Sequence, residues 1–162
     1  MTLISNEIFW LGFFSLLILT LGLRKELRKY APLIITVSLS VGSSDVVSYR
    51  LLKPFFARER PCYVEKDVRL LAAGCGSKYG FPSNHSANAM AFATAFVFFE
   101  KKIFAWPFYV GLYSVVFLVG LSRIYLGVHY PFDVAAGWLV GMVSALFTTK
   151  ILYYILPRRQ EG

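Results

Sequence analysis

The sequence predicts an all-α protein, a polytopic membrane helix bundle of about five transmembrane helices with a short-helix and loop insertion between spans two and three. Three observations support this class. Only 16% of the 162 residues are charged, against roughly 25% in soluble domains; the mean hydropathy is +0.58; and several apolar runs have the length of a membrane helix. With 15 Phe, 10 Tyr and no short repeat, disordered, collagen-like and coiled-coil chains are excluded.

Five apolar stretches follow one another along the chain. The first runs from Ile8 to Leu23 and ends at the basic cluster RKELRK, 24–29. Acidic Glu7 before it and the basic run after it argue against a cleavable signal peptide. The remaining spans are predicted at 31–49, 83–99, 103–121 and 134–156. The apolar part of span 83–99 begins only at Ala87, so we expect neighbouring helices rather than lipid to support its start.

Small residues mark two of these spans as contact faces. Ala87, Ala91 and Ala95 recur at helical spacing, and Gly137 and Gly141 form the sequence GWLVG. Small side chains allow membrane helices to approach closely. We therefore expect spans three and five to pack tightly.

The loops between five spans fall on two sides of the membrane. Lys and Arg are divided almost evenly between the sides, but tight juxtamembrane clusters occur at 24–29, 101–102 and 150–159. We expect that side to be cytoplasmic. The other loops, 55–82 and 122–133, then face the exterior or periplasm, which predicts a multi-pass protein of the cell (inner) membrane whose site opens outward.

Chemistry-bearing residues gather at these two outer loops. Both histidines of the chain, His85 and His129, lie in or beside them, and the cations Lys53, Arg60 and Arg123 lie close to the predicted membrane surface. We interpret the neighbouring Arg58 as an ordinary cation at the membrane interface. Two imidazoles among fixed positive charges are typical of a site for a phosphate group.

Three segments carry a resemblance to a known family: KPFFARERP (53–61), FPSNH (81–85) and SRIYLGVHYPFD (122–133). Together they resemble the three-part signature of the type 2 phosphatidic acid phosphatase superfamily, whose members include bacterial acid phosphatases and vanadium haloperoxidases. The resemblance covers Lys53 to Asp133, half the chain, and implies a single integral membrane phosphatase domain over 1–162. One position departs from the pattern: Asn84 stands where the family usually has Gly.

The resemblance implies a role for each matching residue. His129 is the expected nucleophile, forming a phosphohistidine, and Asp133 four residues later can hold its tautomer because Pro131 favours a helix start between them. His85 is the expected general acid and base. The expected phosphate-binding residues are Lys53, Arg60, Ser83, Asn84 and Arg123. The design requires no metal and no cofactor.

Three further residues lie outside the signature. Asp45 lies within a span, where an acidic group is paired or functional. Asp45, Tyr49 and Lys53 are spaced four residues apart, so we expect them to share one helical face. We expect Asp45 to support the active-site residues by pairing next to them. The alternative is that it makes a purely structural hydrogen bond. Cys62 and Cys75 share the long loop. They form a disulfide if that loop faces an oxidising compartment, and two free thiols if it does not.

These expectations combine into one function. The chain is expected to remove a terminal phosphate from a lipid phosphate or diphosphate, with phosphatidic acid, phosphatidylglycerol phosphate, undecaprenyl diphosphate and the lipid A 1-phosphate as candidates. A lipid phosphotransferase using the same histidine, a vanadate-dependent oxidation catalyst and a non-enzymatic lipid-binding or transport protein are the alternatives. The aromatic residues are interpreted as packing and interface residues, so membrane lipids and no nucleic acid are expected as partners. The sequence does not determine the oligomeric state.

Overall fold

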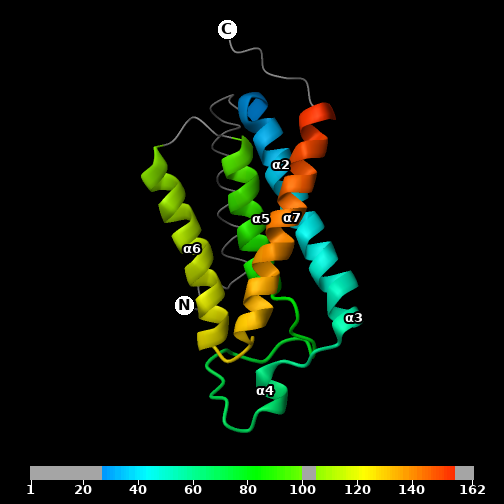
Figure 1. Cartoon of the computed structure of the whole chain (residues 1–162), viewed down its shortest axis with the longest axis vertical. Helices are drawn as coiled ribbons and strands as arrows, with labels where there is room; N and C mark the ends of the chain where they lie inside the picture. The colour runs from blue at the N-terminus through cyan, green and yellow to red at the C-terminus, as the bar shows by residue number, and fades with distance from the viewer. Residues whose placement is uncertain (1–26, 100–104, 156–162) are drawn as a thin grey trace.

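The computed structural model describes residues 27–99 and 105–155. These residues form a helix bundle, and the only β-pairing among them is an isolated bridge between Glu59 and Tyr79. The helices in chain order are α2 (Leu27–Val46), η2 (Val47–Leu52), α3 (Lys53–Phe56), α4 (Pro61–Val64), α5 (Asn84–Phe99), α6 (Trp106–Tyr125) and α7 (Pro131–Ile155). Figure 1 shows the four long helices running along one another, with α4 and the connecting loops at one end.

Three helices of the described chain are long and apolar enough to cross a membrane: Tyr30–Phe56, Trp106–Tyr125 and Pro131–Ile155. The helix α5 has 16 residues, fewer than a lone span needs, and the first predicted span at 8–23 lies outside the described residues. The all-helical class is therefore confirmed, and the count of five spans stays a prediction.

The second predicted span is longer than 31–49, because α2 continues without a break through η2 into α3 and ends at Phe56. The intervening η2 is a π-helix, whose wider turn shifts the register of the residues that follow. As a result Tyr49 is 54% exposed while Lys53 is 4% exposed. Our expectation that Asp45, Tyr49 and Lys53 share one helical face is wrong, because it assumed an uninterrupted α-helix.

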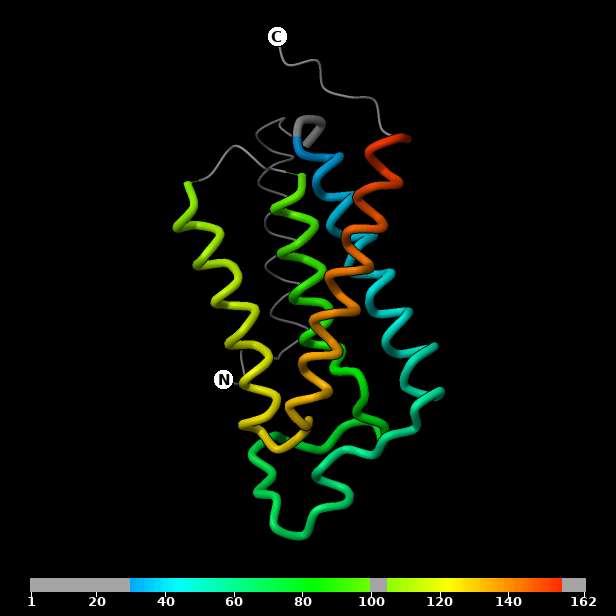
Figure 2. Tube along the Cα trace, in the orientation of Figure 1, coloured from blue at the N-terminus to red at the C-terminus, as the bar shows by residue number. Residues whose placement is uncertain are grey.

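The helix α5 lies at the centre of the bundle and contacts α2, α6 and α7, most extensively α7 (Figure 2). Its Ala87, Ala91 and Ala95 are fully buried. On the facing side of α7, a Cβ at Gly137 would lie 2.6 Å from the carbonyl oxygen of Ser83, and one at Gly141 would collide with the carbonyl of Ala87. Both small-residue patterns therefore allow the same contact, which brings the starts of α5 and α7 together.

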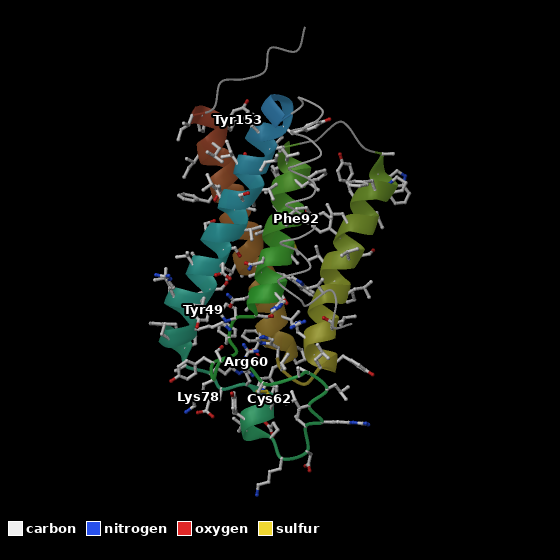
Figure 3. All side chains as sticks on the ribbon, turned by 180° about the vertical axis from the view of Figure 1, so that it is seen from behind. Tyr49, Arg60, Cys62, Lys78, Phe92 and Tyr153 are labelled. Carbon is white, nitrogen blue, oxygen red and sulfur yellow. A yellow bond between two sulfur atoms is a disulfide. The ribbon has the colours of Figure 1, made fainter. Side chains whose placement is uncertain are left out.

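The long connection between α3 and α5 folds across the end of the bundle. It contains α4, and a disulfide joins Cys62 to Cys75; Figure 3 labels Cys62 below Arg60 at this end of the molecule. The N–H of Leu71 donates to the carbonyl of Leu126 at 3.2 Å. This contact joins the long loop to the short loop between α6 and α7.

Gly127 is required in that short loop. It has φ of 74°, and a Cβ there would lie 3.0 Å from the carbonyl oxygen of Arg69. Only glycine combines this backbone conformation with so close an approach. The short loop is consequently held against the long one two residues before His129.

Candidate active site

The carboxylate of Asp133 organises the start of α7. Pro131 begins the helix, which suits the fixed φ of proline, and Asp133 Oδ2 accepts a hydrogen bond from the backbone N–H of Tyr130 at 2.9 Å. This is the reciprocal half of a capping box, in which an acidic residue in the first turn satisfies the N-cap donor. The same Oδ2 lies 3.4 Å from Nδ1 of His129. The helix start therefore sets the orientation of the histidine.

The contacts of His129 determine its tautomer. Its Nε2 lies 2.9 Å from Nη1 of Arg60. Because a guanidinium only donates, Nε2 must accept, and Nδ1 must carry the proton that is donated to Asp133. The lone pair on Nε2 thus points toward Arg60, the position where an electrophilic phosphorus would have to lie for attack.

Burial keeps the His129 imidazole neutral. The residue is 3% exposed, and desolvation lowers the pKa of the imidazole from 6.5 to about 4; the hydrogen bond to Asp133 opposes this, while the positive charges of Arg60 and Lys53 add to it. A neutral imidazole has the free lone pair that a nucleophile needs. The same pocket would favour a phosphate group, because its positive charges remain.

Arg60 is held in place by the long loop. Its Nε donates to the carbonyl of Ser77 at 2.7 Å, and its Nη1 also reaches the carbonyl of Val128 at 3.3 Å. A Cβ at Gly80 would lie 3.0 Å from Cγ of Arg60 and 3.3 Å from Oδ2 of Asp133. A glycine at position 80 thus allows the loop to press the guanidinium against the start of α7.

The other predicted cations converge on the same end of the bundle. Lys53 is buried and its Nζ donates to the carbonyl of Tyr79 at 3.2 Å. Arg123 is 8% exposed and lies in the last turn of α6, so the predicted loop 122–133 begins later than expected, after Tyr125. The positive charges of Arg123, Arg60 and Lys53 act on His85, and His129 is close enough to interact with it electrostatically. The two imidazoles therefore belong to one cationic cluster.

Ser83 joins the second motif to the third. It is fully buried, and its N–H donates to the carbonyl of Asp133 at 2.9 Å. Its own carbonyl accepts the N–H of Ala87 at 3.0 Å, and its hydroxyl accepts a hydrogen bond from Ser86 at 3.1 Å. This bonding places the N-terminus of α5, with its partial positive charge, beside His129 and Asp133.

The side chain of Asn84 points away from this cluster and toward α2. Its Nδ2 donates to Oδ1 of Asp45 at 2.8 Å, and Nδ2 of Asn88 donates to the same oxygen at 3.1 Å. Any contact of Asn84 with phosphate would thus come from its backbone. Asp45 connects the end of α2 to the first turn of α5, which carries His85.

One residue near the site was misinterpreted from sequence. Arg58 resembled an ordinary interfacial cation, but its Nη1 lies 3.2 Å from Oδ1 of Asp133, whose side chain is fully buried. Its guanidinium also lies 4.4 Å from the ring centroid of Tyr130. No spacing in the sequence indicates this pair, because Arg58 and Asp133 are 75 positions apart.

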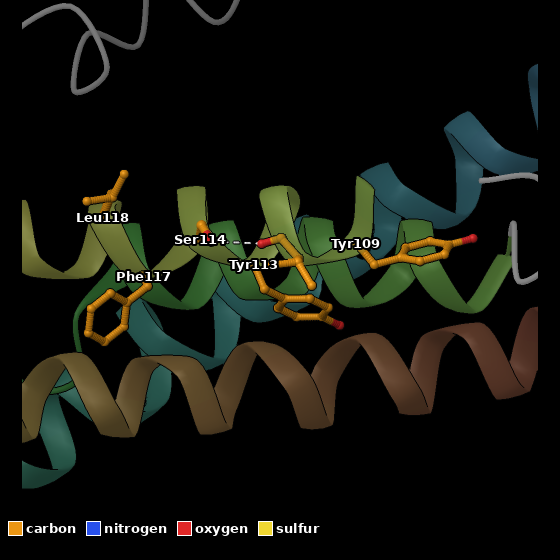
Figure 4. Close-up of a pocket in the computed structure, with 6 residues that line it drawn as sticks. Tyr109, Tyr113, Ser114, Phe117 and Leu118 are labelled. Atoms are coloured by element: carbon orange, nitrogen blue, oxygen red, sulfur yellow. Dashed lines mark hydrogen bonds between the residues drawn. The ribbon is translucent and has the colours of Figure 1, made fainter. Parts of the chain in front are cut away.

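A shallow, open groove lies along the exposed face of α6 (Figure 4). Its lining residues all come from that helix: Tyr109, Val110, Tyr113, Ser114, Phe117 and Leu118. None of them belongs to the three motifs. The cationic cluster that contains Arg60 and His129 lies elsewhere, at the end of the bundle where the loops meet.

Residues 30–157 match the PAP2 superfamily, which is the type 2 phosphatidic acid phosphatase superfamily. This range includes all three motifs. The chain belongs to the PAP2 superfamily. The resemblance inferred from sequence is thereby confirmed.

Relatives in the PAP2 superfamily include membrane phosphatases of bacteria. The chain is 34% identical over 160 residues to the lipid A 4'-phosphatase of Porphyromonas gingivalis, covering 96% of this chain and 66% of that protein. Its structure matches LpxE from Aquifex aeolicus with a TM-score of 0.61 and 33% identity, over 85% of this chain and 76% of the other. It also matches the transmembrane PAP2-type phosphatidylglycerolphosphate phosphatase from Bacillus subtilis, with a TM-score of 0.60 and 28% identity, over 77% and 61%.

These proportions mean that the chain spans about two thirds of the length of the Porphyromonas relative and of the Bacillus structure. Together with the three long apolar helices, the relatives identify an integral membrane protein.

Proposed function

We propose that this protein is a membrane lipid phosphatase that hydrolyses a terminal phosphate monoester or diphosphate of a lipid. The observation that carries the proposal is the contact of Nε2 of His129 with Arg60 while Nδ1 is bonded to Asp133. It supports His129 as the nucleophile, in the tautomer whose Nε2 lone pair is free to attack, with Arg60 beside it as a hydrogen-bond donor to the phosphate oxygens. The lipid class is supported by two relatives, one named as a lipid A 4'-phosphatase and the other as a phosphatidylglycerolphosphate phosphatase.

The proposed reaction has two displacements at phosphorus. A phosphate oxygen replaces Nε2 of His129 as acceptor for Arg60, and the freed lone pair attacks phosphorus while the bond to the lipid oxygen breaks. His85, which is protonated at the start of the reaction, gives a proton to that oxygen and becomes neutral. Water then attacks the phosphohistidine, His85 takes the water proton, and inorganic phosphate leaves His129 as it began.

The fixed cations stabilise the charge that spreads over the phosphate oxygens. Arg60 and Arg123 supply planar sets of donors, and Lys53 supplies a compact charge. Backbone N–H groups at the start of α5, after Ser83, can add hydrogen bonds. Asp133 keeps His129 oriented through both steps.

The site is proposed to face the exterior, which is the periplasm for an inner-membrane protein. The disulfide between Cys62 and Cys75 lies in the loop that carries Arg60, and such bonds persist in oxidising compartments. A membrane-impermeant reductant added to intact cells or spheroplasts tests this. Exposure of both thiols to an impermeant alkylating reagent is expected, and protection until lysis would contradict the orientation.

Phosphate release from a panel of lipids tests the function. Phosphatidic acid, phosphatidylglycerol phosphate, undecaprenyl diphosphate and lipid A 1-phosphate are incubated with the detergent-purified protein, and free phosphate is measured. Release from at least one lipid and near-complete loss in His129→Ala are expected. Arg60→Ala should lose about 10²- to 10³-fold in kcat, as for other transition-state donors. Lys66→Gln, an exposed change in the same loop, is the matched control.

Each contrary result has a distinct meaning. Turnover that survives in His129→Ala would eliminate the phosphohistidine. Lipid dephosphorylation without free phosphate, with label transferred to a second lipid, would instead identify a phosphotransferase. Binding of lipids without turnover of any member of the panel would favour a lipid-binding protein.

A further inference from the structure

The carboxylate that orients His129 has a partner on each oxygen. Oδ2 of Asp133 accepts from Tyr130 N–H at 2.9 Å and faces Nδ1 of His129 at 3.4 Å, while Oδ1 accepts from Nη1 of Arg58 at 3.2 Å. The Asp133 side chain is fully buried. A buried carboxylate is tolerated only when it is paired and hydrogen-bonded, so the contact with Arg58 compensates part of the cost of burying this group.

Arg58 is itself fixed from two directions. Its guanidinium stacks on the ring of Tyr130 at 4.4 Å, and the hydroxyl of that tyrosine donates to Glu65 Oε1 at 2.9 Å, just after α4. Its carbonyl accepts the N–H of Gly80 at 2.8 Å. Arg58 therefore joins the long loop to the first turn of α7, with its charged end on the carboxylate oxygen that His129 does not use.

We propose that Arg58 is a positioning residue of the active site, which holds the Asp133 carboxylate in the rotamer that orients His129 for attack on phosphorus. Without it, the carboxylate is held only through Oδ2, by the Tyr130 N–H and by His129, and the distance from Oδ2 to Nδ1 of His129 is less tightly constrained. The inference rests on the proposed function and adds to it a residue outside the matched motif positions. Arg58 acts through Asp133, whereas Arg60 contacts His129 directly.

Charge gives the proposal a second consequence. The positive charges around the His129–Asp133 pair come from Arg58 and Arg60 in the long loop and from Lys53 on α3. Two other titratable groups are near the pair: His85 faces it from α5, and the Tyr130 hydroxyl lies on the short loop. Removing Arg58 leaves the carboxylate less neutralised, so it attracts a proton onto His129 more strongly. The acid limb of the activity profile should then move to higher pH, because protonated His129 cannot attack.

Steady-state kinetics of Arg58→Gln and Arg58→Lys over a pH series test this inference in the full-length protein, with the lipid that the phosphate-release panel identifies. Arg58→Gln is expected to lower kcat by about 10- to 100-fold, as for other residues that orient a reacting group from behind, with KM little changed and the acid limb displaced upward. Arg58→Lys keeps the charge and should restore the position of the acid limb and part of kcat. Lys66→Gln is the control and should match the wild type.

Four outcomes are informative. Wild-type kcat and an unmoved acid limb in Arg58→Gln would overturn the proposal, as would a loss confined to KM, which would make Arg58 a lipid-headgroup contact. If Arg58→Gln does not accumulate as folded protein, Arg58→Lys alone decides the question. A reduced kcat with an unmoved acid limb in Arg58→Lys supports the proposal. A kcat equal to that of the wild type with an acid limb moved upward refutes the proposal. Failure of the proposed function itself would appear separately, as turnover that survives in His129→Ala.

Discussion

Acidification should destabilise this protein through His129, by an amount that the structure allows to be calculated. Burial lowers the pKa of the imidazole from 6.5 to about 4, so between these values the unfolded chain binds a proton that the folded protein does not. Stability therefore rises with pH across this window and is fully present above pH 6.5. At 1.36 kcal/mol per pH unit, the loss on going down to pH 4 is about 3 kcal/mol.

The assay is a denaturant titration in detergent micelles, which measures the free energy of unfolding of the wild type and of His129→Gln at several pH values. The glutamine keeps a polar side chain and does not titrate. Contributions from the carboxylates, and from His85 apart from its interaction with His129, are common to both proteins and cancel in the difference. The wild type should lose about 3 kcal/mol more than the variant between pH 6.5 and 4. Parallel curves for the two proteins would refute the burial argument.

Three further predictions concern other parts of the molecule. Gly141→Ala should lower the free energy of unfolding by about 1–3 kcal/mol, because the added methyl group would collide with the backbone of α5. Gly111→Ala is the control: its added methyl group has no neighbour within 4 Å, so the same titration should show no loss of stability or a small gain. Asp45→Asn weakens the acceptor for two amides of α5, and kcat should fall by roughly tenfold, about 1.4 kcal/mol in barrier; unaltered turnover would make Asp45 purely structural. Changing both Cys62 and Cys75 to Ser opens a loop of 13 positions and should cost about 3 kcal/mol, and an unchanged unfolding midpoint would contradict this.

Sequence patterns predicted those features of the fold that depend only on residues close together in the chain. The apolar runs predict α6 and α7 to within a few residues, because hydropathy over about 20 residues decides whether a helix can cross a bilayer. The start of α7 follows from Pro131 and the spacing of His129 and Asp133, since capping involves only neighbouring residues. The continuation of α2 through a π-helix to Phe56 has no such signal, and the face assigned to Tyr49 was wrong for that reason.

The site residues illustrate the same division. Their types and order indicate phosphate chemistry, because two imidazoles and several fixed cations are a chemical requirement that the sequence states directly. The contacts that each of these residues makes could not be predicted from the sequence. Arg60 facing His129, and Asn84 turning to Asp45, depend on how distant segments meet.

By itself, the sequence determined a membrane helix bundle, the family, and the side chains available for the chemistry, since all three depend on residue type and on short-range spacing. Only the tertiary structure decided that Arg58 neutralises the far oxygen of Asp133 and that Arg60 covers the lone pair of His129. These contacts join residues about 70 positions apart, and they form because Gly137 and Gly141 let α7 approach α5 while the long loop folds across their common end. Such contacts follow from packing in three dimensions, which no periodicity along the chain records.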